Sequence, residues 1–433
     1  MSRMSQFLFG AGGFAMHASN FLIVTWLTKF YTPGNGKDLV DPWLFGLIFL
    51  FGRIIDAVAD PVVGYWSDHH EGKLGRRIPF IRWGAPFLAL FLFLSFTPIT
   101  KTASLANGIY LAVIMAGFFF FYTVVITPYL ALIPEITNDP KERVNLTTIQ
   151  AVFILIATVY VAALSGPLIQ ALGYVYFMLL SSLLVLAASL APLWAAKPQP
   201  YTRPKGKEEA TIGQIVKWTL STWNNRPFRH VLLSTSFFWF GLNLLMAAIA
   251  LWVTNVLGGK EADVALVMGP LIVSNLLGFW LFNILARRRG KYFAFILMFI
   301  GMILVTPSWF FVQRLTGDMP YLHAMIMSFC LGFPLAGFQS LPYAVLADVI
   351  DHDEELSGER REAIFFGMQA IFQKSMIGLS MVVLQLMRSS FGEVMGLRLL
   401  GPVAAISCLI GLISFLGYSL RELPENPSTT EAS

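Results

Sequence analysis

Asp56 and Asp60 are the side chains of this sequence best suited to chemistry. They lie four positions apart between Trp43 and Trp66, in a stretch otherwise apolar enough to span a bilayer, and Arg53 precedes Asp56 by three positions. A charged side chain costs roughly 2.5–3.5 kcal/mol at the centre of a bilayer, so charges within a span mark a functional site by default. Helical spacing places all three on one face of a helix. This face predicts a cation site that points into a helix bundle or a water-filled cavity.

The composition identifies the environment of these residues. Hydrophobic residues make up 56% of the chain and charged residues 13%, against about 25% charged residues in soluble domains. An integral membrane protein is therefore predicted, with a lipid bilayer and no nucleic acid among its partners. Cys330 and Cys408 lie in apolar runs, so we interpret both as packing residues. The sequence indicates no cofactor, no metal site beyond a possible Na⁺ at Asp56 and Asp60, and no nucleophile–base pair of an enzyme.

Apolar windows of about 20 residues, the length of one membrane crossing, divide the chain. The expected fold is an all-α membrane protein with twelve transmembrane helices. The first window is too long for a signal-peptide core of about 7–15 residues and is interpreted as the first helix. The windows are Leu8–Phe30, Trp43–Trp66, Pro79–Ile99, Ala106–Ile133, Thr147–Leu164, Tyr174–Trp194, Val231–Val253, Val264–Ala286, Phe293–Val312, Tyr321–Val349, Ala363–Met387 and Leu397–Leu420.

Basic residues cluster in every second connection, as at Arg76–Arg77 and Arg287–Arg289. The positive-inside rule then predicts that both termini are cytoplasmic, in a multi-pass protein of the inner (plasma) membrane. Residues 196–229 are rich in Pro, Lys and Glu and are expected to form a cytoplasmic linker between six-helix bundles at 1–195 and 230–421, with a cytoplasmic tail at 422–433. Within the linker, the residues from Ile212 to Thr219 predict either a short amphipathic helix on the membrane surface or a loosely ordered segment.

Two pairs of similar segments repeat at one offset. Pro128-Tyr-Leu-Ala-Leu matches Pro342-Tyr-Ala-Val-Leu, and Gly64-Tyr-Trp matches Gly278-Phe-Trp, in both cases 214 positions apart. Either match alone is compatible with chance, but their agreement at one offset favours duplication of a six-helix unit.

Charged residues at the predicted cytoplasmic ends suggest a gate. Asp68 is followed by a glycine-bearing turn and by Arg76 and Arg77, a pattern that resembles the cytoplasmic gate loop of the major facilitator superfamily. A network of this kind can hold one side of a transporter shut and then release it; the alternative is that the arginines are only positive-inside anchors. Asp348 and Asp351 begin an acidic run that faces Arg360 and Arg361 in the sequence. They are expected either to pair with the basic loop around Arg76 when the cytoplasmic side closes or to form a solvated charge run.

A narrower resemblance is carried by three motifs. They are Arg53-x-x-Asp56-x-x-x-Asp60-Pro61-x-x-Gly64-x-x-x-Asp68, Leu341-Pro-Tyr343-x-x-x-x-Asp348-x-x-Asp351 and Arg360-Arg-Glu-Ala-x-Phe365-Phe-Gly-x-x-x-x-Phe372-x-Lys374. Together they resemble the glycoside–pentoside–hexuronide:cation symporter family, which includes the melibiose carrier and is related to the animal lysophosphatidylcholine carriers. The resemblance covers nearly the whole chain and implies the major facilitator fold with two six-helix repeats.

The resemblance implies a role for each matching residue. Asp56 and Asp60 would ligate the coupling cation, Thr123 would offer it a hydroxyl, and Lys374 would face the central cavity beside them. Elementary electrostatics agrees, because two close carboxylates repel until a cation or proton joins them, and an ammonium group competes for that place. We interpret Arg53 as a structural counter-ion of this cluster.

The chain also departs from the melibiose carrier. Ile126 stands where that carrier has an acidic residue, an arginine that binds substrate falls near Gln150 or Ala151, and an early acidic residue is replaced by the neighbourhood Gly13–His17. The same galactoside network is therefore not expected. The remaining candidates for solute binding are polar residues of the predicted spans, although such residues often only join helices, at roughly 0.6 kcal/mol each. These candidates are His17, Asn20, Tyr122, Gln150, Gln339, Gln369 and Gln373.

The sequence thus predicts a monomeric secondary active transporter. It would couple Na⁺ or H⁺ to symport of a small organic solute, a sugar or glycoside, by alternating access. His17 is either a proton-coupling group or a packing histidine. A carrier of lysophospholipid-like lipids is the main alternative, compatible with the aromatic run Phe118–Phe121; a transport-inactive sensor and a membrane enzyme rank below it.

Overall fold

The computed structural model describes residues 2–34, 36–137, 139–196, 212–312, 319–357 and 361–420. Part of the predicted linker, Arg360 and the predicted tail at 422–433 lie outside these ranges. Every regular element within them is helical. Up to the linker the elements are α1 (Arg3–Tyr31), α2 (Pro42–His69), α3 (Ile78–Leu94), α4 (Leu105–Ala131), α5 (Ile133–Ile136), α6 (Pro140–Val159), η1 (Tyr160–Leu164), α7 (Ser165–Leu190) and α8 (Pro192–Ala195).

A second series of helices begins within the predicted linker, where α9 covers the whole segment from Ile212 to Thr219 that was expected to be amphipathic. Its position on a membrane surface stays a prediction. The elements are α9 (Ile212–Ser221), η2 (Thr222–Asn224), α10 (Arg226–Asn255), η3 (Glu261–Asp263), α11 (Val264–Arg289), α12 (Lys291–Val305), η4 (Thr306–Trp309), α13 (Pro320–Ser357), α14 (Glu362–Phe391) and α15 (Glu393–Leu416).

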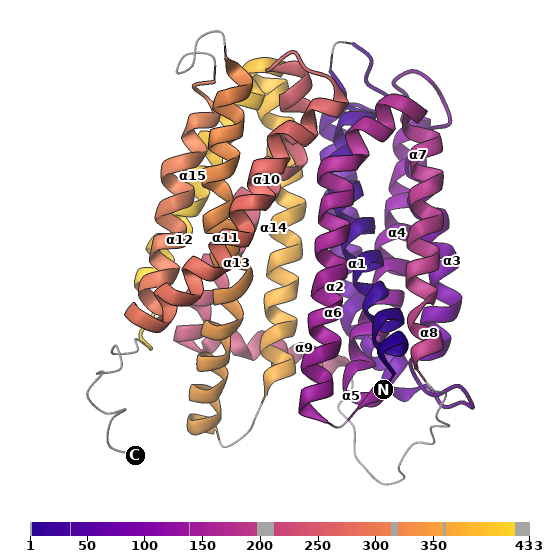
Figure 1. The fold of residues 1–433 in the computed structure, drawn as a ribbon, viewed down its shortest axis with the longest axis vertical. Helices are drawn as coiled ribbons and strands as arrows, with labels where there is room; N and C mark the ends of the chain where they lie inside the picture. The colour runs from indigo at the N-terminus through magenta and orange to yellow at the C-terminus, as the bar shows by residue number, and fades with distance from the viewer. Residues whose placement is uncertain are drawn as a thin grey trace. The chain divides into compact units, whose positions relative to one another are not determined.

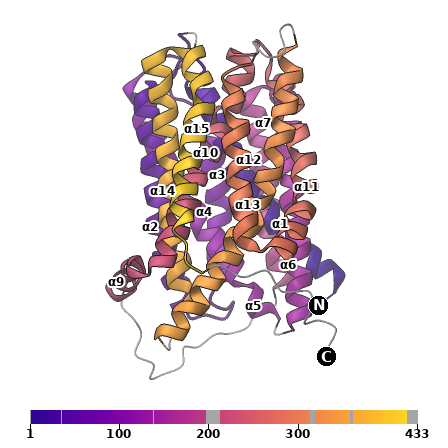
Figure 2. The same ribbon diagram turned by 90° about the vertical axis from the view of Figure 1, so that its left-hand side faces the viewer.

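The chain forms two compact units. The first contains Met1–Ile215, Asn243–Leu266 and Lys374–Leu397, and the second contains Val216–Leu242, Val267–Gln373 and Arg398–Ser433. In the first unit α1 packs against α6 and α7, α2 against α4, and α3 against α4 and α7 (Figure 1). In the second unit α12 packs against α13 (Figure 2).

Capping residues fix where several of these helices begin. The side chain of Asp41 accepts a hydrogen bond from the backbone N–H of Leu44 at the start of α2, and Ser104 accepts one from Asn107 at the start of α4. Such caps satisfy backbone donors that have no partner inside the helix. Pro42 follows Asp41 at the first helical position, where the missing N–H of proline carries no penalty. The start of α2, the helix that carries the two aspartates, is therefore encoded locally.

Ten helices in the described ranges are long and apolar enough to cross a membrane, against twelve predicted. The difference lies in two places. Lys141–Ala195 counts as one segment of 55 residues, and Gly173 interrupts it with a φ of 78°, a conformation that glycine adopts without a steric penalty. The other place is α3, which has only 17 residues.

The boundaries of the fifth predicted window were wrong. Helix α6 begins at Pro140 rather than Thr147, because Asp139 caps it there, and it continues past Leu164 through the π-helical turn η1 into α7. A π turn adds a residue to one helical turn and keeps the chain helical. The spacing of apolar residues is therefore interrupted near Leu164, although the helix does not end there.

Candidate functional site

Helices α2 and α14 approach each other closely in the first unit, at small residues. A Cβ atom placed on Gly378 of α14 would lie 3.1 Å from Cα of Leu50, and one placed on Gly46 of α2 would lie 3.0 Å from Cα of Val382. Small residues allow this backbone approach in membrane helix pairs. Gly378 lies one turn beyond Lys374, so the contact brings the lysine side chain to the aspartate face of α2.

The Lys374 ammonium binds both aspartates. Its Nζ lies 2.8 Å from Oδ1 of Asp56 and 2.7 Å from Oδ2 of Asp60. It also donates to the backbone carbonyl of Asp56 at 3.2 Å. An ammonium group has three N–H donors, and each has an acceptor here. Two residues of one helix and one residue from more than 300 positions later thus form a single charge cluster.

Asp56 is completely buried, with 0% of its side chain exposed. The hydroxyl of Thr123 donates to Oδ1 at 2.9 Å, and Nη1 of Arg53 lies 3.3 Å from Oδ2. Both carboxylate oxygens therefore accept hydrogen bonds, as a buried ion requires. Asp60 is 32% exposed. Of the two carboxylates, Asp60 is the one that water or an arriving ion reaches first.

Arg53 is held from three sides. Its Nη2 donates to Oδ1 of Asn20 on α1 at 2.8 Å, and its guanidinium carbon lies 4.5 Å from the ring centroid of Phe119 and 5.4 Å from that of Phe49. A guanidinium over an aromatic face gains a cation–π contact. The Nε atom of Arg53 is buried and has no hydrogen-bond partner within the described residues. The geometry fits the structural counter-ion role that the sequence suggested.

The cluster carries no net charge, since two carboxylates face one guanidinium and one ammonium. The ammonium lies where an added cation would find the same carboxylate and carbonyl oxygens. Oxygen ligands of this kind suit hard cations, and a proton would bind the carboxylates equally directly. A cation that enters leaves an excess positive charge unless Lys374 moves away or loses its proton.

The other predicted solute-binding residues divide between the two units. In the first unit the hydroxyl of Tyr122 donates to the carbonyl of Met16 at 3.1 Å, and the ring of His17 lies 5.2 Å from that of Phe21. Gln150 is buried against α1, where a Cβ on Gly13 would lie 2.9 Å from its Cγ. The contacts of Tyr122 and Gln150 join helices, whereas that of His17 lies within α1.

Three predicted glutamines belong to the second unit. Gln369 is buried, and its Oε1 lacks a hydrogen-bond partner among the described residues. Gln339 is exposed and Gln373 is half-buried. The structure therefore brings Asp56, Asp60, Thr123, Arg53, Lys374 and Asn20 together in one cluster, and gives no such arrangement for the glutamines.

The predicted gate residues after α2 form an ion-pair network. Arg77 binds Asp68 and lies 3.2 Å from Oε1 of Glu135, whose same oxygen lies 2.6 Å from Nε of Arg76. Glu135, in the short helix α5, was not among the predicted residues, although its position after an apolar span offered a signal. A cavity of about 450 Å³ adjoins this network, lined by Arg76, Arg77 and Glu135 among others and not by Asp56 or Asp60.

The acidic run near the end of α13 has basic and polar partners within the second unit. Lys291, the first residue of α12, lies 2.7 Å from Oδ1 of Asp348. Arg361 pairs with Asp353 at 2.7 Å, and Asn225 donates to the same carboxylate at 3.1 Å. The role of Asp348 and Asp351 as gate partners stays a prediction. Asp351 lies on the exposed side of the helix.

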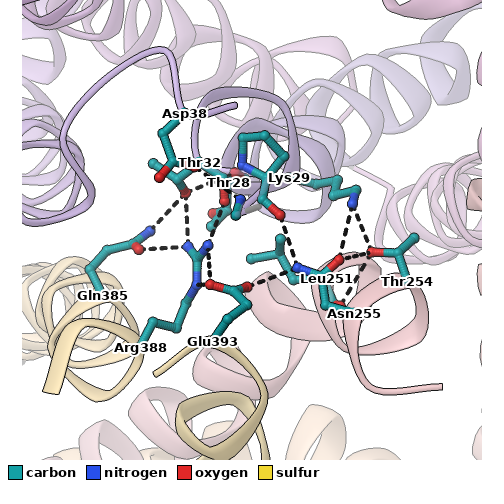
Figure 3. Close-up of polar contacts among 12 residues, drawn as sticks. Thr28, Lys29, Thr32, Asp38, Leu251, Thr254, Asn255, Gln385, Arg388 and Glu393 are labelled. Carbon is teal, nitrogen blue, oxygen red and sulfur yellow. Dashed lines mark hydrogen bonds and ion pairs between the residues drawn. The ribbon is translucent and has the colours of Figure 1, made fainter. Parts of the chain in front are cut away.

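A second polar cluster of the first unit was missed by the sequence analysis. It surrounds Arg388 near the end of α14 and includes Glu393, Thr32 and Asn255 (Figure 3). These residues lie at helix ends, where charges are ordinary, so only the folded chain shows that Arg388 is buried.

The fold and the charge cluster define a class: a polytopic helical transporter with ionisable residues inside its spans. A family model described as MFS/sugar transport protein matches residues 8–407. The chain belongs to this family of major facilitator transporters. The match confirms the resemblance to the glycoside–pentoside–hexuronide:cation symporter family, and the protein is a transporter rather than an enzyme.

Individual relatives agree with this assignment. The isoprimeverose transporter of Lactiplantibacillus pentosus is 24% identical, over 90% of this chain and 80% of the relative. The sodium-dependent lysophosphatidylcholine symporter 1-B of Danio rerio is 24% identical, over 89% and 81% respectively. Among solved structures, the nucleoside transporter NupG has a similar fold, with a TM-score of 0.72 at 11% identity over 96% of this chain and 99% of that chain.

Proposed function

We propose that this protein couples the movement of Na⁺ or H⁺ to symport of a sugar or glycoside by alternating access. The single observation that carries the proposal is the pair of carboxylates, fully buried Asp56 and partly exposed Asp60, that holds the Lys374 ammonium in place of a cation. A buried charge cluster of this kind marks ion pathways in membrane proteins. Asp56, Asp60 and Thr123 are the proposed cation ligands.

In the proposed cycle, Lys374 and the coupling ion exchange places. Without the ion, the ammonium neutralises the two carboxylates, and the unloaded transporter reorients without carrying an unpaired charge through the bilayer. When the ion binds, Lys374 is released from Asp56 and Asp60, and its ammonium becomes a donor for hydroxyl groups of the solute. Ion and solute then favour each other's binding, which is the reciprocal coupling that symport requires.

We further propose twelve transmembrane helices in two six-helix repeats, with both termini in the cytoplasm of a cell whose inner (plasma) membrane holds the protein. An ion pair of each half supports the repeat. Arg77 pairs with Glu135 at 3.2 Å and Lys291 pairs with Asp348 at 2.7 Å. The two bases lie 214 positions apart and the two acids 213, close to the offset of the repeated segments. Each base lies at the start of a helix, α3 or α12, and its acid lies in α5, just after α4, or in the last third of α13.

The proposed solute class rests on the family and on the relative that is named an isoprimeverose transporter. Asn20, which binds Arg53, is the polar candidate nearest to the cation site by its contacts. Gln369, with its unpartnered Oε1, is the candidate in the second unit. Both offer amide groups, which suit the hydroxyls of a sugar as donor and acceptor.

A lysophospholipid-like solute is the second candidate. A relative with this printed activity covers 89% of the chain, and Phe118 and Phe119 are buried next to the cation site. An apolar acyl chain would pack against aromatic side chains better than a sugar would.

Reconstituted transport tests these proposals. Proteoliposomes would be given labelled isoprimeverose, other labelled glycosides or fluorescent lysophosphatidylcholine, with Na⁺ and pH gradients imposed separately. We expect accumulation of a glycoside that follows one of the two gradients. Uptake of lysophosphatidylcholine alone would select the second candidate. Uptake that ignores both gradients would refute cation coupling.

A further inference from the structure

The Arg388 cluster lies about 21 Å from Lys374 along α14, as 14 residues at 1.5 Å each require. All of its residues belong to the first unit. It gathers the end of α1, the end of α10 and the turn between α14 and α15 around one guanidinium (Figure 3). It lies at the C-terminal end of α1.

Every N–H group of Arg388 is used. Nε lies 2.9 Å and Nη2 2.8 Å from Oε2 of Glu393. Nη1 donates to the hydroxyl of Thr32 at 2.9 Å and to Oε1 of Gln385 at 2.7 Å, and Nη2 also donates to the carbonyl of Thr32 at 2.7 Å. Thr32 is the C-cap residue of α1, whose terminal carbonyls attract cations. With 2% of its side chain exposed, Arg388 is buried and satisfied.

Asn255 extends the cluster to α10. Its amide nitrogen donates to Oε1 of Glu393 at 2.8 Å and to the carbonyl of Pro33 at 2.9 Å. The ammonium of Lys29 lies 2.7 Å from the hydroxyl of Thr254. Two separate sets of contacts therefore join α1 to the later helices, one through Arg388 and one through Asn255 and Thr254.

The position of these contacts suggests their role. In the proposed repeat, α1 belongs to the N-terminal half, whereas α10, α14 and α15 belong to the C-terminal half. We propose that Arg388, Glu393, Asn255 and Thr32 form an outer latch, which holds the two halves together on the non-cytoplasmic side and must part when the transporter opens to that side. This inference rests on the proposed alternating-access function.

The chemistry of the latch suits a contact that opens and closes. Its charges balance between Arg388 and Glu393, and its other members are neutral polar groups or backbone carbonyls. Water can hydrate each of these groups when the latch parts, so the open state leaves no group unsatisfied. An apolar seam of the same size would instead expose hydrocarbon on opening.

A buried reporter measures latch opening without any solute. Met381 lies on α14 between Lys374 and Arg388, is 0% exposed and contacts Thr28 of α1. We would introduce Met381→Cys after replacing the native cysteines (Cys330→Ser, Cys408→Ala), and label with a membrane-impermeant maleimide from the outer side. Arg388→Ala and Glu393→Gln should each raise the labelling rate at least tenfold. The matched control, Lys101→Met, removes an exposed basic residue at the same end and should leave the rate unchanged.

A cross-link provides the opposite test. The side chains of Thr32 and Gln385 touch, with Nε2 of the glutamine 3.3 Å from the threonine hydroxyl. Thr32→Cys with Gln385→Cys, oxidised to a disulfide, should stop solute uptake, and a reducing agent should restore it. Unchanged labelling in both latch variants, or full uptake in the cross-linked protein, would overturn the latch. Absence of gradient-driven uptake in the parent protein would instead refute the proposed function. The labelling assay needs no solute, so it still tests the latch in that case.

Discussion

Lys374 and Arg388 are two basic residues on one helix, α14, and their environments differ in kind. Lys374 is 17% exposed and binds two carboxylates and one carbonyl. Arg388 is 2% exposed and binds one carboxylate, while its other acceptors are neutral. A compact ammonium among anionic oxygens can be exchanged for another compact cation. A planar guanidinium in a fitted set of acceptors cannot.

The comparison teaches which charges of a membrane protein are functional and which are structural. The acceptors around Lys374 suit a cation or a proton as well as they suit an ammonium group. The acceptors around Arg388 suit a planar guanidinium group with five N–H donors, and few other groups. These differences support the proposals of ion exchange at the first region and conformational locking at the second. The following predictions separate them.

The largest effect is expected from Asp56. Asp56→Asn removes the negative charge that the ion and Lys374 share, so gradient-driven accumulation should fall to the passive level. The measurement is solute uptake into proteoliposomes under the coupling gradient. Asp41→Asn, on the same helix, is the matched control, because asparagine caps a helix start as well as aspartate does. Normal accumulation by Asp56→Asn would show that the ion binds elsewhere.

Arg388→Met should reduce stability more than any change at the ion site. It leaves the partly buried Glu393 without its charged partner, and breaking one side of a buried pair costs about 3–5 kcal/mol. Thermal unfolding of the purified protein in detergent measures the loss. The double variant Arg388→Met with Glu393→Met should recover part of it, since neither charge is then left alone. An unfolding temperature equal to that of the parent protein would contradict a buried, fully bonded Arg388.

Lys374→Met should change ion binding without a comparable loss of stability. Removing the competing ammonium leaves two close carboxylates that repel each other unless a cation binds between them. The apparent affinity for the coupling ion should therefore rise at least tenfold. Calorimetric titration of the purified protein with NaCl, at several pH values, measures this affinity. Lys101→Met is again the control. An affinity that falls would mean that Lys374 assists the ion rather than competes with it.

The smallest effect is expected from Thr123→Val. It removes one hydrogen bond to the buried carboxylate of Asp56, and a bond to a charged group contributes about 1.5–3 kcal/mol. The apparent affinity for the coupling ion should fall roughly tenfold, while Thr123→Ser should restore most of it. The same titration gives the result. A valine variant that binds the ion as the parent does would remove Thr123 from the proposed ligands.

Much of the fold was readable from the sequence because the bilayer imposes simple demands. A span must be apolar for about 20 residues, so each predicted window overlaps a helix of the structure. The count was less secure, because α3 is short and because Gly173 makes a turn within one continuous helical segment. Those boundaries depend on local backbone conformation, which apolar composition does not encode.

The charge cluster was predictable because charged side chains inside a bilayer are energetically unfavourable and therefore rare. Asp56, Asp60 and Lys374 stand out because ionisable residues rarely occur within apolar spans. The structure brings them to within hydrogen-bond distance of one another; their role in binding the ion stays a prediction. Glu135 gave only a weak signal and Arg388 none, since charges at helix ends are common and need no partner.

The sequence by itself determined that this chain is a helical membrane protein with charges inside a span, because the solvent sets that pattern residue by residue. It also specified the helix starts at Asp41 and Ser104 through local caps. Only the tertiary structure decided that Lys374 reaches α2, and that Arg388 is buried against the end of α1. Those contacts join residues more than 300 positions apart, and they depend on the close packing of helices, which no local pattern describes.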